Sequence, residues 1–314
     1  MIVVTGGAGF IGSNLIRALN QRGERDILLV DHLSNGRKMH NIADLDIADY
    51  MDKEEFIEKI GVVHFFDGVR AVFHQGACSA TTEWDGRYVM RNNYDYSKRL
   101  LHWCISKNVA FMYASSASVY GDGKQGFQVD RSCEQPINMY AYSKFQFDQY
   151  VRPLLTRTKS PIVGFRYFNV YGPREQHKGS MSSTIFHFNQ QVLEQKRAKL
   201  FKGCDGMADG EQKRDFVHVD DVVNVNLWFL DHPEQRGIYN VGTGRAETFN
   251  AVAQAVTDWH TEGDIEYIPF PEHLKGAYQS YTQADISGLR DAGYAEEFLT
   301  VKQGVARYLD WLNK

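Results

Sequence analysis

The sequence has 314 residues, 43% of them hydrophobic, and a formal net charge of −4. This length is sufficient for a large hydrophobic core in one big domain or two small ones, and the slightly acidic charge gives no electrostatic reason to expect nucleic acid or an anionic membrane as a partner. No apolar run approaches the roughly 18 residues that span a bilayer, and the four cysteines lie too far apart to form a paired metal-binding motif, so we expect a cytoplasmic protein with free thiols and no metal.

The first thirty residues predict a β-strand, a glycine-rich turn, a helix and a second strand. The run "IVVT" is followed by "GGAGFIG", a segment with apolar residues near a 3.6-residue period, and "DILLVD", which ends in Asp31. In such a unit Gly6 permits the tight turn, Gly9 lets the backbone approach a pyrophosphate, and Gly12 lets the helix pack against the strand. The spacing therefore predicts the first β-α-β unit of a dinucleotide-binding fold, with phosphates at the helix N-terminus.

The choice between NAD and NADP depends on Asp31 and on the basic residues that follow it. An acid at this position ordinarily binds the 2′-hydroxyl of the adenosine ribose and favours NAD. Arg37 and Lys38 follow within a few residues, and Lys53 lies further along the chain. These cations could hold the 2′-phosphate of NADP, so the residues favour NADP, although a solvated basic surface is an equal alternative.

Predicted strands and helices continue to alternate as far as about residue 170. Further strands are expected at 71–77, 110–116 and 162–172, and helices at 88–108 and 141–155. This alternation predicts an α/β fold of the Rossmann type, with a doubly wound parallel sheet.

The second half of the sequence predicts a smaller lobe. Polar loops rich in glycine and proline interrupt the alternation beyond residue 170, which favours a C-terminal substrate-binding lobe. We expect a cofactor-binding Rossmann domain at 1–170, to which 215–243 returns, and a substrate-binding lobe formed mainly by 171–214 and 244–314.

Two similar pentapeptides place a tyrosine four residues before a lysine, "YDYSK" at 94–98 and "YAYSK" at 140–144. On a helix this spacing puts the two side chains on one face. Chemistry in an open α/β sheet gathers at the carboxyl ends of the strands. The second copy follows the loop after a strand end, "ASSASVYG", whereas the first lies in the helix before that strand. We therefore expect Tyr140 and Lys144 to be catalytic, together with Ser116 from the strand end.

Proton chemistry explains why this trio would be useful. Free tyrosine has a pKa near 10, and a neighbouring ammonium and an oxidised nicotinamide would both favour the phenolate and lower that pKa. Tyr140 would then take the proton of a substrate alcohol as hydride leaves its carbon, while Ser116 hydrogen-bonds the same oxygen. At least one of Ser115 and Ser116 is expected only to cap the end of the strand.

The motifs "GGAGFIG", "SSASVYG", "YAYSK" and "FRYFNVYGPR" together resemble the extended short-chain dehydrogenase/reductase superfamily, whose members act largely on nucleotide sugars. Longer stretches at 76–98, 168–183, 213–230 and 265–285 resemble the family of ADP-heptose 6-epimerases. That resemblance implies an isomerase that uses NADP and interconverts ADP-D-glycero-D-manno-heptose and ADP-L-glycero-D-manno-heptose by transient oxidation at C-6, for lipopolysaccharide core biosynthesis. It also implies a homo-oligomer, a pentamer.

The resemblance extends the set of expected binding residues. The cofactor is expected to contact Gly6, Gly9, Phe10, Ile11, Gly12, Asp31, His32, Lys38, Lys53, Gln75, Gly76, Ala77, Cys78, Ser79, Asn92, Lys144, Val170 and Lys178. The substrate is expected to contact Ser116, Asn169, Ser180, His187, Phe201, Lys202, Gly203, Cys204, Arg214 and Tyr278. Arg214 has independent support, because a guanidinium suits the diphosphate of a nucleotide sugar. An isolated histidine such as His187 is more often a packed surface residue.

Inversion of a secondary alcohol through a ketone suggests a role for Lys178. Hydride must leave one face of the carbon and return to the other. The ketone intermediate would therefore have to turn its other face toward the nicotinamide, and its oxygen would then point away from Tyr140. A second proton donor would then be needed, and the resemblance places Lys178 there. The alternative is a lysine that only binds a phosphate of the cofactor or the substrate.

Two other function classes are compatible with parts of the sequence. A nucleotide-sugar 4-epimerase would share the same visible chemistry. A 4,6-dehydratase is disfavoured, because Ala117 and Ser118 stand where an acidic pair would drive water elimination. A non-enzymatic NADP-sensing protein typically lacks the tyrosine–lysine pair that is present here.

Overall fold

The computed structural model describes residues 1–62, 66–271 and 279–314, and the chain divides into two compact units. The first unit comprises Met1–Val119, Pro136–Arg166 and Val223–Tyr239, and the second comprises Tyr120–Gln135, Tyr167–Val222 and Asn240–Lys314. Residues 120–135, 167–170, 215–222 and 240–243 thus cluster with the second unit, whereas the division expected from the sequence assigned them to the first.

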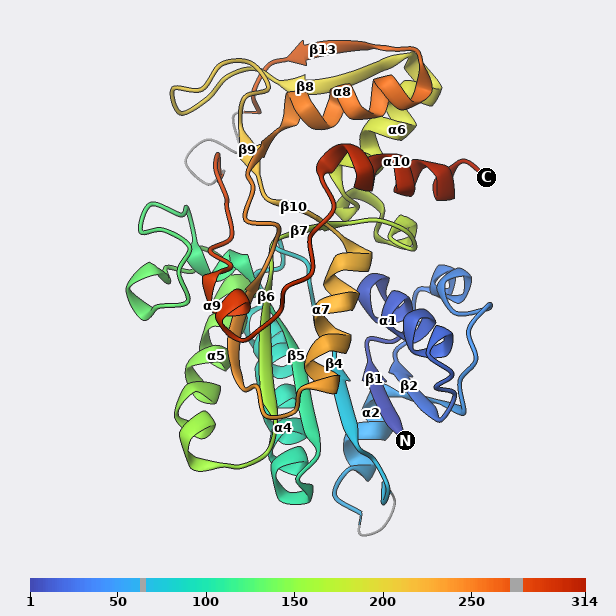
Figure 1. The fold of residues 1–314 in the computed structure, drawn as a ribbon, viewed down its shortest axis with the longest axis vertical. Coiled ribbons are helices and arrows are strands. Elements are labelled where there is room, and N and C mark those ends of the chain that lie inside the picture. Colours follow the sequence, from blue (N-terminus) through green and yellow to red (C-terminus); the bar gives the residue numbers. More distant parts are fainter. Residues whose placement is uncertain (63–65, 272–278) are drawn as a thin grey trace. The chain divides into compact units, whose positions relative to one another are not determined.

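The first unit is built around a seven-stranded sheet. Its strands are β1 (Ile2–Thr5), β2 (Ile27–Asp31), β3 (Asp49–Asp52), β4 (Ala71–His74), β5 (Ala110–Ser116), β6 (Ile162–Tyr167) and β11 (Gly237–Val241). Its helices are α1 (Phe10–Gln21), α2 (Lys53–Lys59), α3 (Gly86–Met90), α4 (Tyr96–Lys107) and α5 (Met139–Arg157), and α7 (Val219–Asp231) enters it from the second unit. Figure 1 shows α4 and α5 beside β5, and α1 beside β1.

The strand order, β11-β6-β5-β4-β1-β2-β3, confirms the predicted Rossmann-type sheet. Pairing is parallel at each step from β3 through β2, β1 and β4 to β5. The order reverses between β1 and β4, and the crevice beyond the carboxyl ends of strands at such a switch point is where ligands bind in this fold class. The topology therefore places a ligand site next to Thr5 and His74.

The predicted segments correspond closely to the observed elements, although some bounds differ and the strand expected at 71–77 ends at His74. The strand expected at 110–116 is β5, and the helix expected at 141–155 is α5, which begins two residues earlier because the Asn138 side chain caps it by accepting from the Ala141 amide. The helix expected at 88–108 contains a five-residue π-helical turn, Arg91–Asp95, between α3 and α4. The strand expected at 162–172 is divided into β6 and β7 (Asn169–Tyr171).

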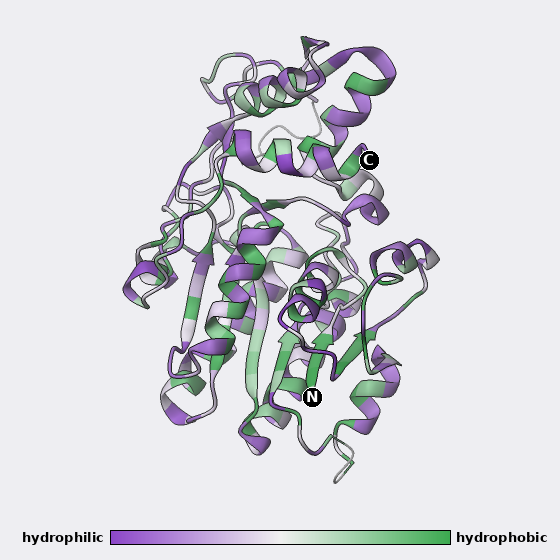
Figure 2. Cartoon of the chain, turned by 45° about the vertical axis from the view of Figure 1, so that its right-hand side comes forward, coloured by the Kyte–Doolittle hydropathy of each residue, from purple (hydrophilic) through white to green (hydrophobic). Residues whose placement is uncertain are grey.

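Buried apolar residues hold the first unit together. Strands β1 and β2 are buried along their whole length, as expected for parallel strands covered on both faces. Leu100 and Leu101 of α4 and Phe147 and Val151 of α5 pack into the same core. In Figure 2 the strands near the N-terminus are coloured as hydrophobic, whereas the surrounding helices also carry hydrophilic turns.

The second unit contains three two-stranded sheets and its own core. Its strands are β7 (Asn169–Tyr171), β8 (Arg197–Phe201), β9 (Lys213–Arg214), β10 (Phe216–His218), β12 (Glu247–Thr248) and β13 (Asp264–Ile268), paired as β10-β7, β12-β9 and β13-β8. Its helices are α6 (Thr184–Gln195), α8 (Phe249–His260), α9 (Ser287–Asp291) and α10 (Val301–Leu312). Helices α6, α8 and α10 bury apolar side chains around Val192, Val256 and Val305.

Candidate active site

The glycine-rich turn after β1 is shaped for close approach of backbone. Gly6 has a positive φ of 66°, and a Cβ there would lie 2.6 Å from the amide nitrogen of Gly76. A Cβ on Gly12 would lie 2.2 Å from the Gly6 carbonyl oxygen, so helix and turn can meet this closely only with glycine there. Helix α1 begins after Gly9 without a side-chain cap. Its first amides, those of Phe10 and Ile11 included, are therefore suited to phosphate oxygens.

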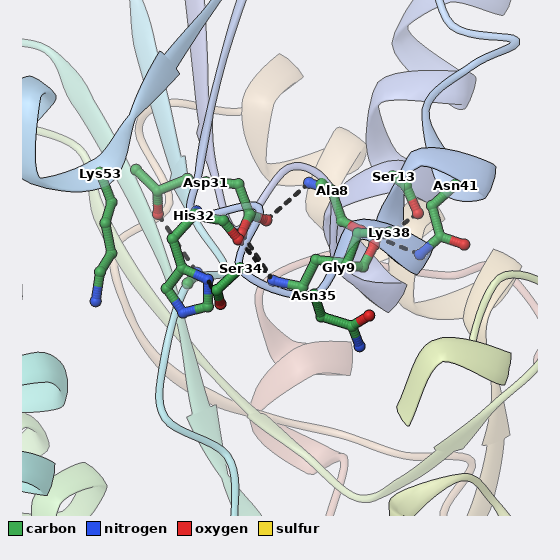
Figure 3. Close-up of polar contacts among 12 residues, drawn as sticks. Ala8, Gly9, Ser13, Asp31, His32, Ser34, Asn35, Lys38, Asn41 and Lys53 are labelled. Atoms are coloured by element: carbon green, nitrogen blue, oxygen red, sulfur yellow. Dashed lines mark hydrogen bonds and ion pairs between the residues drawn. The ribbon is translucent and has the colours of Figure 1, made fainter. Parts of the chain in front are cut away.

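The carboxylate of Asp31 at the end of β2 is fully engaged (Figure 3). One oxygen accepts from the Ala8 amide at 2.9 Å, and the other accepts from Lys38 Nζ at 2.8 Å. Both partners of this ion pair are largely buried, with side chains 4% and 16% exposed. Asp31 is thus neutralised by the basic residue that the sequence singled out. His32 lies next to it, and its ring contacts the Ser34 hydroxyl at 3.2 Å.

Other predicted cofactor residues of this unit follow the carboxyl ends of β3 and β4 or lie in the π-helical turn Arg91–Asp95. Lys53 Nζ donates to the side-chain oxygen of Asn92 at 2.7 Å. Gln75 donates to Asn226 on α7 at 3.3 Å. Gly76, Ala77, Cys78 and Ser79 form the loop that follows β4.

The predicted catalytic trio comes together at the end of β5. The Ser116 hydroxyl hydrogen-bonds the Tyr140 phenol, and Ser116 Oγ also accepts from the Ser118 amide at 3.2 Å. Lys144 is buried and donates to the Ala114 carbonyl at 2.7 Å. The sequence-based choice of the strand-end hydroxyl, the tyrosine and the lysine therefore defines one cluster of side chains.

The acidity of this cluster differs from the sequence-based expectation. Burial raises the pKa of Tyr140, and the hydrogen bond from Ser116 lowers it only in part. Burial also lowers the pKa of Lys144 to about 8, against the attraction of the Asp148 carboxylate, which raises it. The expected net lowering of the tyrosine pKa does not occur, because removal from water disfavours the phenolate and this effect dominates.

Asp148 is a buried residue of this cluster that the sequence analysis missed. It lies one helical turn after Lys144 and forms a fully buried ion pair with Arg166 of β6, at 2.9 Å. Its carboxylate also accepts from Ser115 at 2.9 Å and from Tyr113 at 2.8 Å. Ser115 is therefore the structural serine of the pair at the strand end.

The other pentapeptide, at 94–98, forms a different kind of contact. Lys98 Nζ lies 4.8 Å from the centroid of the Tyr94 ring and 4.8 Å from that of Tyr150. This cation–π arrangement joins α4 to α5. Tyr142 of the second pentapeptide is exposed, as expected for a side chain facing away from the trio.

The predicted substrate residues other than Ser116 and Tyr278 fall in the second unit, as do Val170 and Lys178. Asn169 and Val170 open β7, and Lys178 and Ser180 lie in the 3₁₀ segment Gln176–Met181. The His187 ring lies 3.4 Å from the Ser180 carbonyl. Phe201 ends β8, and Lys202, Gly203 and Cys204 follow it. Tyr278 lies outside the described residues.

Arg214 and Lys178 have distinct environments within this unit. Arg214 is buried, donates to the Lys213 carbonyl at 2.9 Å and lies 5.7 Å over the Phe249 ring. Burial lowers the pKa of Lys178, and the Glu175 carboxylate opposes that change.

Comparison with known proteins identifies the family to which this site belongs. Residues 2–242 match the NAD dependent epimerase/dehydratase family. The chain belongs to this family. Its trio and its glycine-rich turn both fall inside the matched region, so the resemblance inferred from the motifs is confirmed at the level of the family.

Relatives within the NAD dependent epimerase/dehydratase family indicate the kinds of enzyme that the chain resembles in sequence and in structure. The chain is 59% identical over 310 residues to an ADP-L-glycero-D-manno-heptose-6-epimerase of Alkalilimnicola ehrlichii, covering 99% of this chain and 97% of the relative. The crystal structure of the enzyme of that name from Helicobacter pylori superposes with a TM-score of 0.85 at 30% identity, covering 99% and 96%. A UDP-glucose 4-epimerase of Thermus thermophilus, in complex with NAD, superposes with a TM-score of 0.79 at 26% identity, covering 99% and 98%.

No helix among the described residues is long and apolar enough to cross a membrane. The four cysteines are free, as expected.

Proposed function

We propose that this protein interconverts ADP-D-glycero-D-manno-heptose and ADP-L-glycero-D-manno-heptose by transient oxidation at C-6, for lipopolysaccharide core biosynthesis. The observation that carries the proposal is the 59% identity, over 99% of the chain, to a heptose 6-epimerase. The cluster of Ser116, Tyr140 and Lys144 supports it, because these residues supply the proton chemistry that the oxidation of a secondary alcohol requires.

Each residue of the trio has a role that follows from its contacts. Tyr140 accepts the proton of the substrate hydroxyl when one epimer is oxidised, and it returns a proton to that oxygen when the same epimer is formed again. Ser116 hydrogen-bonds Tyr140 and is placed to hydrogen-bond the substrate oxygen as well. Lys144 holds a positive charge one helical turn from the phenol, where a cation favours the phenolate. Its attachment to the Ala114 carbonyl fixes the position of that charge.

The glycine-rich turn and the residues around it fit a nicotinamide dinucleotide. The diphosphate would lie at the N-terminus of α1, where Gly6, Gly9 and Gly12 permit close backbone approach. Lys38 is proposed to support NADP over NAD, because its ammonium neutralises Asp31 with one hydrogen bond and would offer its remaining hydrogens to the 2′-phosphate. Further contacts are proposed for His32, Lys53, Asn92 and the loop 75–79. The bound nicotinamide would supply the acceptor and donor of hydride.

Substrate contacts are proposed in the second unit. Arg214 would bind the diphosphate of the nucleotide sugar, since a guanidinium offers two parallel donors. Asn169, Ser180, His187, the segment 201–204 and Tyr278 complete the proposed substrate set. Lys178 is proposed as the second proton-transfer group. By family resemblance we also propose a cytoplasmic homo-oligomer, a pentamer.

The test of this function is incubation of the purified protein with ADP-D-glycero-D-manno-heptose, without added reductant, followed by chromatographic and NMR analysis of the product. We expect a mixture of the two C-6 epimers without net oxidation. A parallel incubation with UDP-glucose distinguishes a 4-epimerase. Formation of UDP-galactose with no change in ADP-heptose would replace the proposed function by that of a 4-epimerase.

A further inference from the structure

Asn93 is a buried side chain with three hydrogen bonds in the π-helical turn Arg91–Asp95. It is 1% exposed, and the sequence analysis assigned it no role. A π-helical turn widens a helix locally by one residue, and such turns occur frequently at functional sites. Here the turn lies between α3 and α4, and Asn93 is the buried residue within it.

The Asn93 side chain connects two segments of the first unit, and the first of these is the loop after β4. The Asn93 side-chain oxygen accepts from the Cys78 amide at 2.8 Å, and its side-chain nitrogen donates to the Cys78 carbonyl at 2.9 Å. Both polar groups of the Cys78 backbone are therefore fixed by one side chain. This loop carries the five residues, 75–79, that are proposed to contact the cofactor.

The second segment that Asn93 contacts is formed by the first turns of α5. The second hydrogen of the Asn93 amide is donated to Ser143 Oγ at 2.9 Å. Ser143 is fully buried and donates in turn to the backbone carbonyl of Tyr140 at 2.7 Å. The hydroxyl hydrogen of Ser143 is thus donated to the Tyr140 carbonyl, and the hydroxyl oxygen accepts a hydrogen bond from Asn93.

We propose that Asn93 is a positioning residue that fixes the cofactor-binding loop and the backbone of Tyr140 relative to each other through Cys78 and Ser143. The proposal rests on the proposed epimerase function. Hydride and proton must leave the substrate in a matched geometry, and a displacement of about 1 Å can cost on the order of 10²-fold in rate. Asn93 uses both of its amide hydrogens and its oxygen on these two segments, so few other side chains could replace it.

The chain provides a matched control in Asn240. This asparagine is 2% exposed and also makes three hydrogen bonds, accepting from Tyr120 at 2.6 Å and donating to the carbonyls of Phe127 and Asp285 at 2.6 and 3.0 Å. None of these partners belongs to the trio or to the loop 75–79. Asn93→Ala and Asn240→Ala therefore remove the same side-chain atoms and the same number of buried hydrogen bonds.

The experiment measures kcat and KM for ADP-D-glycero-D-manno-heptose, together with Tm, for wild type, Asn93→Ala, Ser143→Ala and Asn240→Ala. We expect both asparagine variants to lose thermal stability. Of the two asparagine variants, only Asn93→Ala should lose kcat, by about 10²-fold with little change in KM, because ground-state binding is retained while the reacting groups are misaligned. Ser143→Ala cuts only the branch to Tyr140 and should lose kcat less, in the same direction. The double variant should lose less than the product of the two single losses, since the two side chains share one interaction.

The outcomes distinguish the positioning role of Asn93 from the proposed epimerase function. Equal kcat in Asn93→Ala and Asn240→Ala would overturn the positioning role while leaving the epimerase function intact. If Asn93→Ala does not fold, Ser143→Ala provides the test, because it removes only the connection between Asn93 and Tyr140. A wild-type kcat in that variant overturns the positioning role of Asn93, and a loss of kcat with little change in KM supports it. Absence of epimerisation by the wild-type protein would overturn the proposed function and, with it, the reaction for which Asn93 positions Tyr140.

Discussion

The ammonium of Lys144 donates a hydrogen bond of 2.7 Å to the carbonyl of Ala114, two residues before Ser116 on β5. This contact ties helix α5 to the strand end that carries the serine. Tyr140 reaches the same strand end through its phenol, which hydrogen-bonds Ser116. The trio is therefore held by two separate contacts between one helix and one strand, and each can be tested by a single substitution.

Tyr140→Phe should abolish most epimerase activity while the protein continues to bind cofactor. The substitution removes only the proton-transfer hydroxyl, and such groups typically contribute about 10²–10⁴-fold to the rate. Steady-state rates and a cofactor titration, measured on the same preparation, test this expectation. Tyr94→Phe is the matched control, because that tyrosine contacts Lys98 and Tyr150 through its ring and should retain near-normal turnover. Loss of activity in the Tyr94 variant alone would show that the wrong pentapeptide was chosen.

Lys144 should make the folded protein more stable as pH rises from 8 toward 10. Burial lowers its pKa from the ordinary lysine value of 10.5 to about 8. Between these values the unfolded chain binds a proton that the folded protein does not, so stability increases with pH across this window. The full difference corresponds to about 3 kcal/mol. Below pH 8 the lysine is protonated in both states and contributes no slope.

Denaturant unfolding at several pH values between 8 and 10 measures this effect. Lys144→Met should lose the upward slope, and Lys159→Met, which removes an exposed lysine, should retain it. Buried tyrosines such as Tyr140 oppose this slope near its upper end, because a phenol titrates near pH 10 in the unfolded chain and at higher pH when it is buried. Lys144→Met keeps these tyrosines, so its difference from wild type isolates the effect of the lysine. The same slope in wild type and Lys144→Met would mean that burial does not lower the pKa of Lys144 in the folded protein.

The sequence predicted the features that depend on local pattern. Periodicity and glycine spacing predicted β1, α1 and β2, and the order of segments along the chain was sufficient to prefer Tyr140 over Tyr94. The structure then placed Ser116 and Lys144 beside Tyr140 at one strand end, as expected for a parallel sheet.

The features that were missed depend on partners distant in sequence. Asn93 is one polar residue in a helical pattern, and its importance appears only when Cys78 and Ser143, 15 and 50 residues away, are brought to it. Asp148 has the helical spacing from Lys144 that could have drawn attention to it, but its partner Arg166 lies on the strand β6, 18 residues further along the chain. The raised pKa of Tyr140 was missed because spacing predicts which charges are near, and not how much water is excluded.

Lys38→Ala should weaken NADP binding far more than NAD binding. The variant removes the ammonium proposed to meet the 2′-phosphate and also leaves the Asp31 carboxylate uncompensated. A hydrogen bond to a charged group contributes about 1.5–3 kcal/mol, which corresponds to roughly 10–100-fold in Kd. The freed carboxylate can accept the 2′-hydroxyl of NAD, so NAD affinity should be nearly unchanged. Titration of both cofactors, with Arg37→Ala as the control at the exposed neighbouring position, measures the difference. An equal loss for NADP and NAD would refute a role for Lys38 at the 2′-phosphate.

Lys178 lies in a setting that suits a second proton-transfer group. Its amide donates to the Glu175 carbonyl at 2.9 Å, which fixes the start of the segment Gln176–Met181. Burial lowers the pKa of its ammonium, against the opposing effect of the Glu175 carboxylate. A lysine whose pKa moves toward neutrality transfers protons more readily at physiological pH. A ketone that presents its other face would need such a donor on the side away from Tyr140.

Lys178→Met should bind cofactor and ADP-heptose but epimerise very slowly, because one of the two faces would lack a proton donor. Lys178→Arg separates this role from simple phosphate binding, since a guanidinium keeps the positive charge but does not release a proton. If Lys178 transfers protons, both variants should be slow, yet both should still oxidise or reduce a C-6 aldehyde analogue in the one epimeric series that needs only Tyr140. If Lys178 only binds phosphate, Lys178→Arg should restore turnover, and excess substrate and cofactor should rescue Lys178→Met. Full epimerase activity in Lys178→Met would exclude both roles and would leave protonation on the second face to another group of the protein or to water.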